Sequence, residues 1–183
     1  LGEGRSGYLA ELIDEQGWVL LAMNWTGMYE DDVYDIVLMS ASDVSRFAFI
    51  PERSMQGFVE KMAGMRMMMG DFGDDPALQF PDGDGVDQRV LDPERRYYYG
   101  NSQGAILGGA LVALSPDIQR AVLGVGGLPY AMLLSRSSDF VTYFMLFKEK
   151  FPDSRDVSLL VNGLIQQLWD PGEAGGYAYE MNR

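Results

Sequence analysis

The segment that most constrains the fold is "YYYGNSQGAILGG", residues 97–109, which predicts a strand, a sharp turn and a buried helix. The turn has the pattern G-x-S-x-G, with Gly100 and Gly104 two residues either side of Ser102. Small residues are needed there because the strand and the helix approach each other closely. The pattern therefore predicts that Ser102 lies at the start of a helix, where backbone N–H groups favour developing negative charge.

A serine nucleophile on such a turn needs a base, which is usually histidine. The 183 residues contain no histidine. Either Ser102 has no catalytic role, or the other catalytic groups lie outside these residues. The alternative for Ser102 is a tight turn in a nucleotide-binding or purely structural βα unit. The strand before it and the apolar helix after it favour the nucleophile.

Along the whole chain, predicted strands alternate with predicted helices. The apolar run "WVLLAM", residues 18–23, is typical of a strand buried on both faces. The further strands are expected at residues 96–99 and 121–125. Helices are expected between Ser6 and Gly17 and at residues 32–69 (broken at 50–51), 102–114, 138–151 and 156–169, with a long surface loop at 70–93. This alternation predicts an α/β fold, a mainly parallel sheet with flanking helices.

Three pieces of the chain resemble the α/β-hydrolase fold family, and especially its bacterial esterase-like and lipase-like members. They are "GYLAELIDEQGWVLLAMNW", "LDPERRYYYGNSQGAILGGAL" and "RAVLGVGG". They are similar to the first helix with the fourth strand, to the fifth strand with the nucleophile turn and its helix, and to the sixth strand. The resemblance spans most of the chain, and the G-x-S-x-G turn is its one specific motif.

The resemblance implies a serine hydrolase that acts on carboxylic esters without a cofactor. Ser102 would be the nucleophile, and the backbone N–H of Gln103 would form one half of the oxyanion hole. The other half would come from residues 1–4 or from just before them. The acid and the base of the triad would lie outside this chain, and Asp170 is given no catalytic role. The alternative is a non-catalytic α/β-hydrolase-like module that serves in binding or assembly.

The resemblance also implies one α/β-hydrolase-like domain over residues 1–183, incomplete at both ends, with a possible helical cap at residues 128–169. In that family the third strand lies between the fourth and the fifth. The matching strand would precede this chain, so we expect a further strand between residues 18–23 and 96–99. It would come from the same polypeptide or from a partner chain.

Charge and composition limit the partners. The net charge is −13 and the pI is near 4.2, which argues against binding to nucleic-acid backbones. No apolar run has the length of a membrane span. Without cysteine or histidine, a zinc or iron site is not expected. The expected partners are a small-molecule ester and the remaining segments of the hydrolase.

Four other segments each allow two interpretations. Methionines at 62, 65 and 67–69 predict adaptable core packing or part of an apolar substrate wall. Residues 128–151, rich in phenylalanine, predict a lid over an acyl pocket or ordinary helix packing. The acidic residues between 71 and 92 favour a solvated loop over a Ca²⁺ site, because "DGDGVD" lacks the EF-hand pattern. Arg95 and Arg96 predict surface ion pairs.

Overall fold

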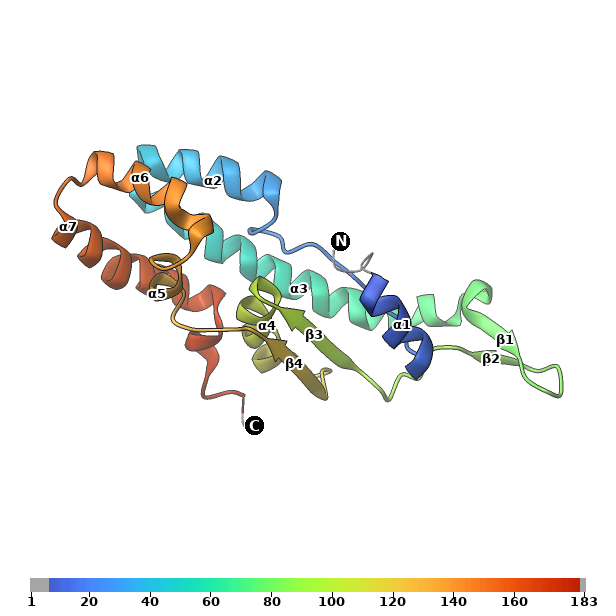
Figure 1. Ribbon diagram of the computed structural model, residues 1–183. Helices are drawn as coiled ribbons and strands as arrows, with labels where there is room; N and C mark the ends of the chain where they lie inside the picture. The colour runs from blue at the N-terminus through green and yellow to red at the C-terminus, as the bar shows by residue number, and fades with distance from the viewer. Residues whose placement is uncertain (1–6, 182–183) are drawn as a thin grey trace. The chain divides into compact units, whose positions relative to one another are not determined.

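The computed structural model describes residues 7–181, and their contacts divide into two compact units. Unit 1 contains residues 1–25 and 59–95, and unit 2 contains residues 26–58 and 96–183. The long helix α3 (Phe49–Met69) has its first half in unit 2 and its second half in unit 1. Figure 1 shows the elements of both units.

Unit 1 contains α1 (Gly7–Gln16), the end of α3, and a small antiparallel sheet. Gly17 ends α1 with a left-handed φ of 63°. Its N–H donates a hydrogen bond to Asp14 O and the N–H of Trp18 donates to Ile13 O, so carbonyls in the last turn of the helix are satisfied. The predicted stop at Gly17 is confirmed. After α3 come the short helices η3 (Asp71–Asp74) and η4 (Pro76–Leu78), and then β1 (Gln79–Pro81) paired with β2 (Asp87–Arg89).

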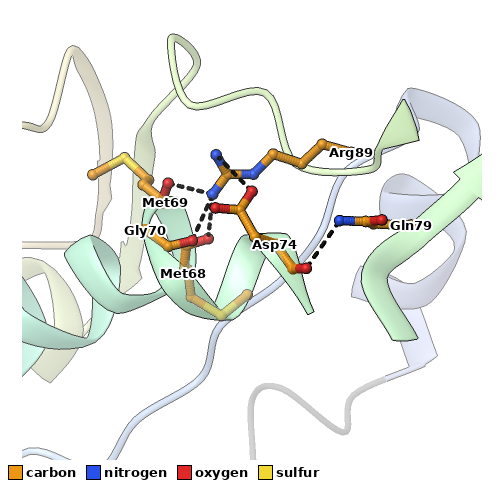
Figure 2. A network of polar contacts seen from close by, with 6 residues as sticks. All are labelled: Met68, Met69, Gly70, Asp74, Gln79 and Arg89. Atoms are coloured by element: carbon orange, nitrogen blue, oxygen red, sulfur yellow. Dashed lines mark hydrogen bonds and ion pairs between the residues drawn. The ribbon is translucent and has the colours of Figure 1, made fainter. Parts of the chain in front are cut away.

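Arg89 joins this small sheet to the end of α3. Figure 2 shows its guanidinium donating to the backbone carbonyls of Met68, Met69 and Gly70, with Asp74 3.6 Å away. The carbonyls of Met68 and Met69 belong to the last turn of α3, where carbonyls have no partner within the helix, and Gly70 directly follows it. Arg89 therefore acts as the C-terminal cap of α3.

Unit 2 contains one strand–helix–strand unit and a layer of helices. β3 (Tyr97–Asn101), α4 (Gln103–Leu114) and β4 (Arg120–Gly124) follow one another, and the two strands pair in parallel beside α4 (Figure 1). The strands and the helix were predicted from the sequence, and their existence is confirmed. The remaining helices are α2 (Glu30–Ser42), η2 (Val44–Ala48), α5 (Tyr130–Leu134), η5 (Ser138–Phe140), α6 (Val141–Lys150), α7 (Ser154–Leu159), the π-helix η6 (Leu160–Ile165), α8 (Gln166–Trp169), η7 (Asp170–Gly172) and η8 (Ala174–Tyr177).

The core of unit 2 is centred on Trp169. Its ring is stacked 4.1 Å from the ring of Tyr130 and lies 5.2 Å from that of Phe47. Ile165 and Val161 of the preceding π-helix are also buried in this cluster, and Ile106 of α4 packs against it. The core thus holds α4 against the helical layer.

The predicted fold class is wrong. The structure is 60% helical, and its described residues contain only two two-stranded sheets, one of them antiparallel. Residues 18–23 form no strand, and the side chains of residues 18–21 are 42–48% exposed, so this run is not the buried strand that its composition predicts. A Cβ placed on Gly64 of α3 would lie 2.9 Å from Met23 Sδ and 3.4 Å from Leu21 Cδ2. With no strand at 18–23, a mainly parallel sheet has too few members.

Two boundaries also differ from expectation. The helical stretch breaks at Asp43, which caps η2 through its side chain, and not at residues 50–51. Pro51 lies in the first turn of α3, where its missing N–H has no intrahelical acceptor to lose. The expected loop at 70–93 contains β1 and β2, joined by a turn in which Asp82 accepts from the N–H groups of Asp84 and Val86.

Candidate active site

The turn at Ser102 has the backbone conformation that the motif predicts. Ser102 has φ 52° and ψ −114°, the first central position of a type II′ turn, where glycine predominates. A side chain at this position costs of order 1–3 kcal/mol. Such conformations persist only when the surrounding structure enforces them, and they cluster at functional sites.

The backbone at the turn is tightly packed around Gly100 and Gly124. A Cβ on Gly100 would lie 2.5 Å from the carbonyl carbon of Gly104 and closer still to its oxygen. The end of the strand and the start of the helix are therefore in direct backbone contact. On the neighbouring strand, a Cβ on Gly124 would lie 3.1 Å from Asn101 Oδ1. A side chain at Gly100 would therefore collide with the backbone at the start of α4.

The side chain of Ser102 is left available. Ser102 occupies the N-cap position of α4, yet its side chain makes no capping bond, and within the described residues no partner for Oγ is found. Its backbone is held on both sides, because its N–H donates to Gly124 O and its carbonyl accepts from the N–H groups of Ala105 and Ile106. A serine kept only as a helix cap would use its hydroxyl for that purpose.

Backbone donors lie next to the hydroxyl. Gln103 is the first residue of α4, and no acceptor for its N–H is found among residues 7–181. The side chain of Gln103 has a separate partner, because its Nε2 donates a hydrogen bond to Met28 O at 3.1 Å. The first turn of a helix carries unpaired N–H groups and a partial positive charge. The N–H of Gln103, which the resemblance assigns to an oxyanion hole, is thus without an acceptor in the described residues, and residues 1–4, expected to supply the other half, lie outside them.

The turn lies at the carboxyl ends of two parallel strands. In the described part of the chain, the non-glycine residues with positive φ are Ser102, directly after β3, and Val125, directly after β4. Ligands of open parallel sheets bind at this edge. The bond from Ser102 N–H to Gly124 O, 2.9 Å long, ties the two strand ends together.

Among residues 7–181, no carboxylate or lysine forms a hydrogen bond with Ser102 Oγ that would make it a base. The carboxylate that the sequence analysis missed is Glu173, which is 1% exposed and accepts from Tyr130 N–H and from Gln166 Nε2, both at 2.6 Å. Burial raises the pKa of Glu173, although these two hydrogen bonds oppose the shift. Its oxygens hold α5 to α8, which is a structural role, and Asp170 beside it accepts from Gln166 as well.

In unit 1, Lys61 has an altered pKa that the sequence did not reveal. Lys61 is largely buried, its Nζ donates to Asn24 O at 2.7 Å, and it lies 3.9 Å from the centre of the Trp25 ring. Burial lowers the pKa of Lys61 to about 8. Only the packing around the lysine, which the sequence pattern does not encode, produces this shift.

The other predicted segments have mixed outcomes. In residues 128–151, Tyr130, Phe144 and Phe151 belong to or pack against the core, which supports ordinary packing for them. Arg95 forms the expected surface ion pair with Asp92, whereas Arg96 donates to the carbonyl of Asp117. Both interpretations of the methionines remain predictions.

No three acidic side chains among the described residues are grouped so that they could hold a metal ion. None of the described helices combines the length and apolar character that crossing a membrane requires.

Comparison of the chain with protein-family models, with curated proteins and with solved structures finds no match.

Proposed function

We propose that Ser102 is the nucleophile of a serine hydrolase that acts on carboxylic esters. The observation that carries this proposal is the backbone of Ser102, a non-glycine residue held at φ 52° and ψ −114° with its hydroxyl unbonded within the described chain. A serine side chain that destabilises the protein at this position is accounted for if its hydroxyl has a catalytic function. The resemblance to α/β-hydrolases remains a prediction, supported by the unit of β3, the turn, α4 and β4.

In the proposed reaction Ser102 Oγ attacks the ester carbonyl carbon. The Oγ proton passes to a base, and the electron pair of the carbonyl bond moves onto the oxygen, next to the N–H of Gln103. Collapse of this intermediate expels the alkoxide, which takes the proton from the base. Water then cleaves the acyl-serine and releases the acid. Because the chain contains no histidine, a histidine base would come from outside these 183 residues.

The second candidate is a non-catalytic module for binding or assembly. The absence of histidine from the chain favours it. In that case the hydroxyl of Ser102 would have no nucleophilic role, and the turn would serve only to connect β3 to α4.

Covalent labelling separates the two candidates. Because the chain contains no histidine, imidazole is added as the base. Under these conditions an alkyl fluorophosphonate is expected to modify Ser102, and peptide mass mapping should place the adduct on the peptide that contains the turn. Ser102→Ala should abolish labelling. Ser135→Ala is the control, because Ser135 is an exposed serine at the opposite, C-terminal end of a helix, α5, and it should leave labelling unchanged. Labelling that survives in Ser102→Ala, or none in the unsubstituted chain, would contradict the nucleophile assignment.

A further inference from the structure

The side chain that fills the space under the turn is Tyr98 of β3. Its hydroxyl donates to the carbonyl oxygen of Gly104 at 2.5 Å. A Cβ on Gly108 would lie 2.6 Å from this hydroxyl oxygen and 2.7 Å from Cζ of the same ring. A Cβ on Gly100 would lie 2.7 Å from the hydroxyl. The Tyr98 ring thus fits against three glycines spaced four residues apart.

This contact closes a loop around the nucleophile. Tyr98 precedes Ser102 by four residues, and Gly104 follows it by two, so the bond ties the strand before the turn to the first turn of α4. The other bonds of the turn involve the backbone of Ser102 itself. The Tyr98 hydroxyl is a side-chain donor that links β3 to the first turn of α4.

The hydroxyl acts as a donor. Burial raises the pKa of Tyr98 well above its usual value, so the phenol is a protonated donor at neutral pH. Its two neighbours differ, because Tyr97 and Tyr99 lie on the opposite face of the strand and are 48% and 47% exposed.

We propose that Tyr98 is a positioning residue that holds Ser102 and the Gln103 N–H in their reactive arrangement through its bond to the Gly104 carbonyl. This inference rests on the proposed function for its effect on reactivity, but its structural part does not. Tyr98 touches neither substrate nor reacting atoms, and it acts through the backbone of the turn.

The test replaces one hydroxyl at a time along β3. In Tyr98→Phe the maximal rate constant of fluorophosphonate labelling at Ser102 is expected to fall about tenfold, whereas the concentration for half-maximal rate stays unchanged. Tyr97→Phe and Tyr99→Phe are the matched controls and should label at the unsubstituted rate. A general loss of structure would alter both parameters together with the far-UV circular dichroism spectrum. An unchanged labelling rate in Tyr98→Phe would overturn the inference.

A second readout does not depend on labelling. In the unsubstituted chain the Tyr98 hydroxyl proton is expected to exchange slowly enough with water to be observed by NMR. The backbone resonances of Ser102 and Gln103 should shift in Tyr98→Phe and remain in place in the two controls. If Ser102 never reacts with the probe but these shifts occur, the proposed function fails and the positioning role stands. A rapidly exchanging hydroxyl proton would refute the positioning role even if the phenylalanine variant did not fold.

Discussion

Gly100→Ala is expected to destabilise unit 2 by at least about 3 kcal/mol. The new methyl group would lie 2.5 Å from the backbone carbonyl carbon of Gly104 and 2.7 Å from the Tyr98 hydroxyl. Backbone atoms at the start of a buried helix cannot move aside as the end of a flexible side chain can. Overpacking into rigid surroundings commonly costs about 1–3 kcal/mol and occasionally more. The loss should be measured as the free energy of unfolding in urea.

Gly163→Ala provides the matched control. Gly163 is also in unit 2, within the π-helix η6, and a Cβ there would meet nothing within 4 Å. Alanine is favoured over glycine in helices by about 0.5–1 kcal/mol, so this variant should be slightly more stable than the unsubstituted chain. Equal effects of the two substitutions would show that β3 and α4 are not in close contact at the turn.

The second large effect concerns the base. The 183 residues alone are expected to hydrolyse p-nitrophenyl butyrate slowly, because Ser102 has no histidine to accept its proton. A positioned general base contributes about 10²–10⁴-fold to a rate. Added imidazole should therefore raise the rate with saturation, and a histidine supplied by a further segment or partner chain should give the full factor.

Free imidazole also cleaves this ester, so Ser102→Ala at the same imidazole concentrations is the required control. The variant should show only the linear rate of imidazole in solution. The rate difference between the two proteins reports the reaction at Ser102. A fast, imidazole-independent rate that both proteins share would mean that the ester is cleaved elsewhere.

Local signals in the sequence predicted the turn and its flanking elements. Gly100 and Gly104 indicated the close approach of strand and helix, and Gly17 indicated the end of α1. Both features depend on residues only a few positions apart in the sequence. The strand β3 and the helix α4 followed from the apolar pattern on either side of the turn. The sharp turn at Ser102 was therefore predictable from the G-x-S-x-G spacing between a strand and an apolar helix, whereas its positive φ is a finding of the structure.

The partners of apolar segments could not be predicted in this way. Residues 18–23 have the composition of a buried strand, but such a run is equally compatible with packing against a helix, and Leu21 and Met23 lie against Gly64. Pairing is decided by residues distant in the sequence. The burial of Glu173 and Lys61 depends on the same long-range packing, so neither the carboxylate nor the lysine could be singled out beforehand.

The central claim is that Ser102 keeps a costly backbone conformation for the sake of its side chain. The most direct measurement is the free energy of unfolding of Ser102→Gly compared with Ser102→Ala. Glycine removes a strain of about 1–3 kcal/mol but loses about 0.5–1 kcal/mol through its more flexible unfolded chain, whereas alanine keeps the strain. The account predicts that the glycine variant is the more stable of the two by about 1 kcal/mol. A glycine variant no more stable than the alanine variant would contradict it.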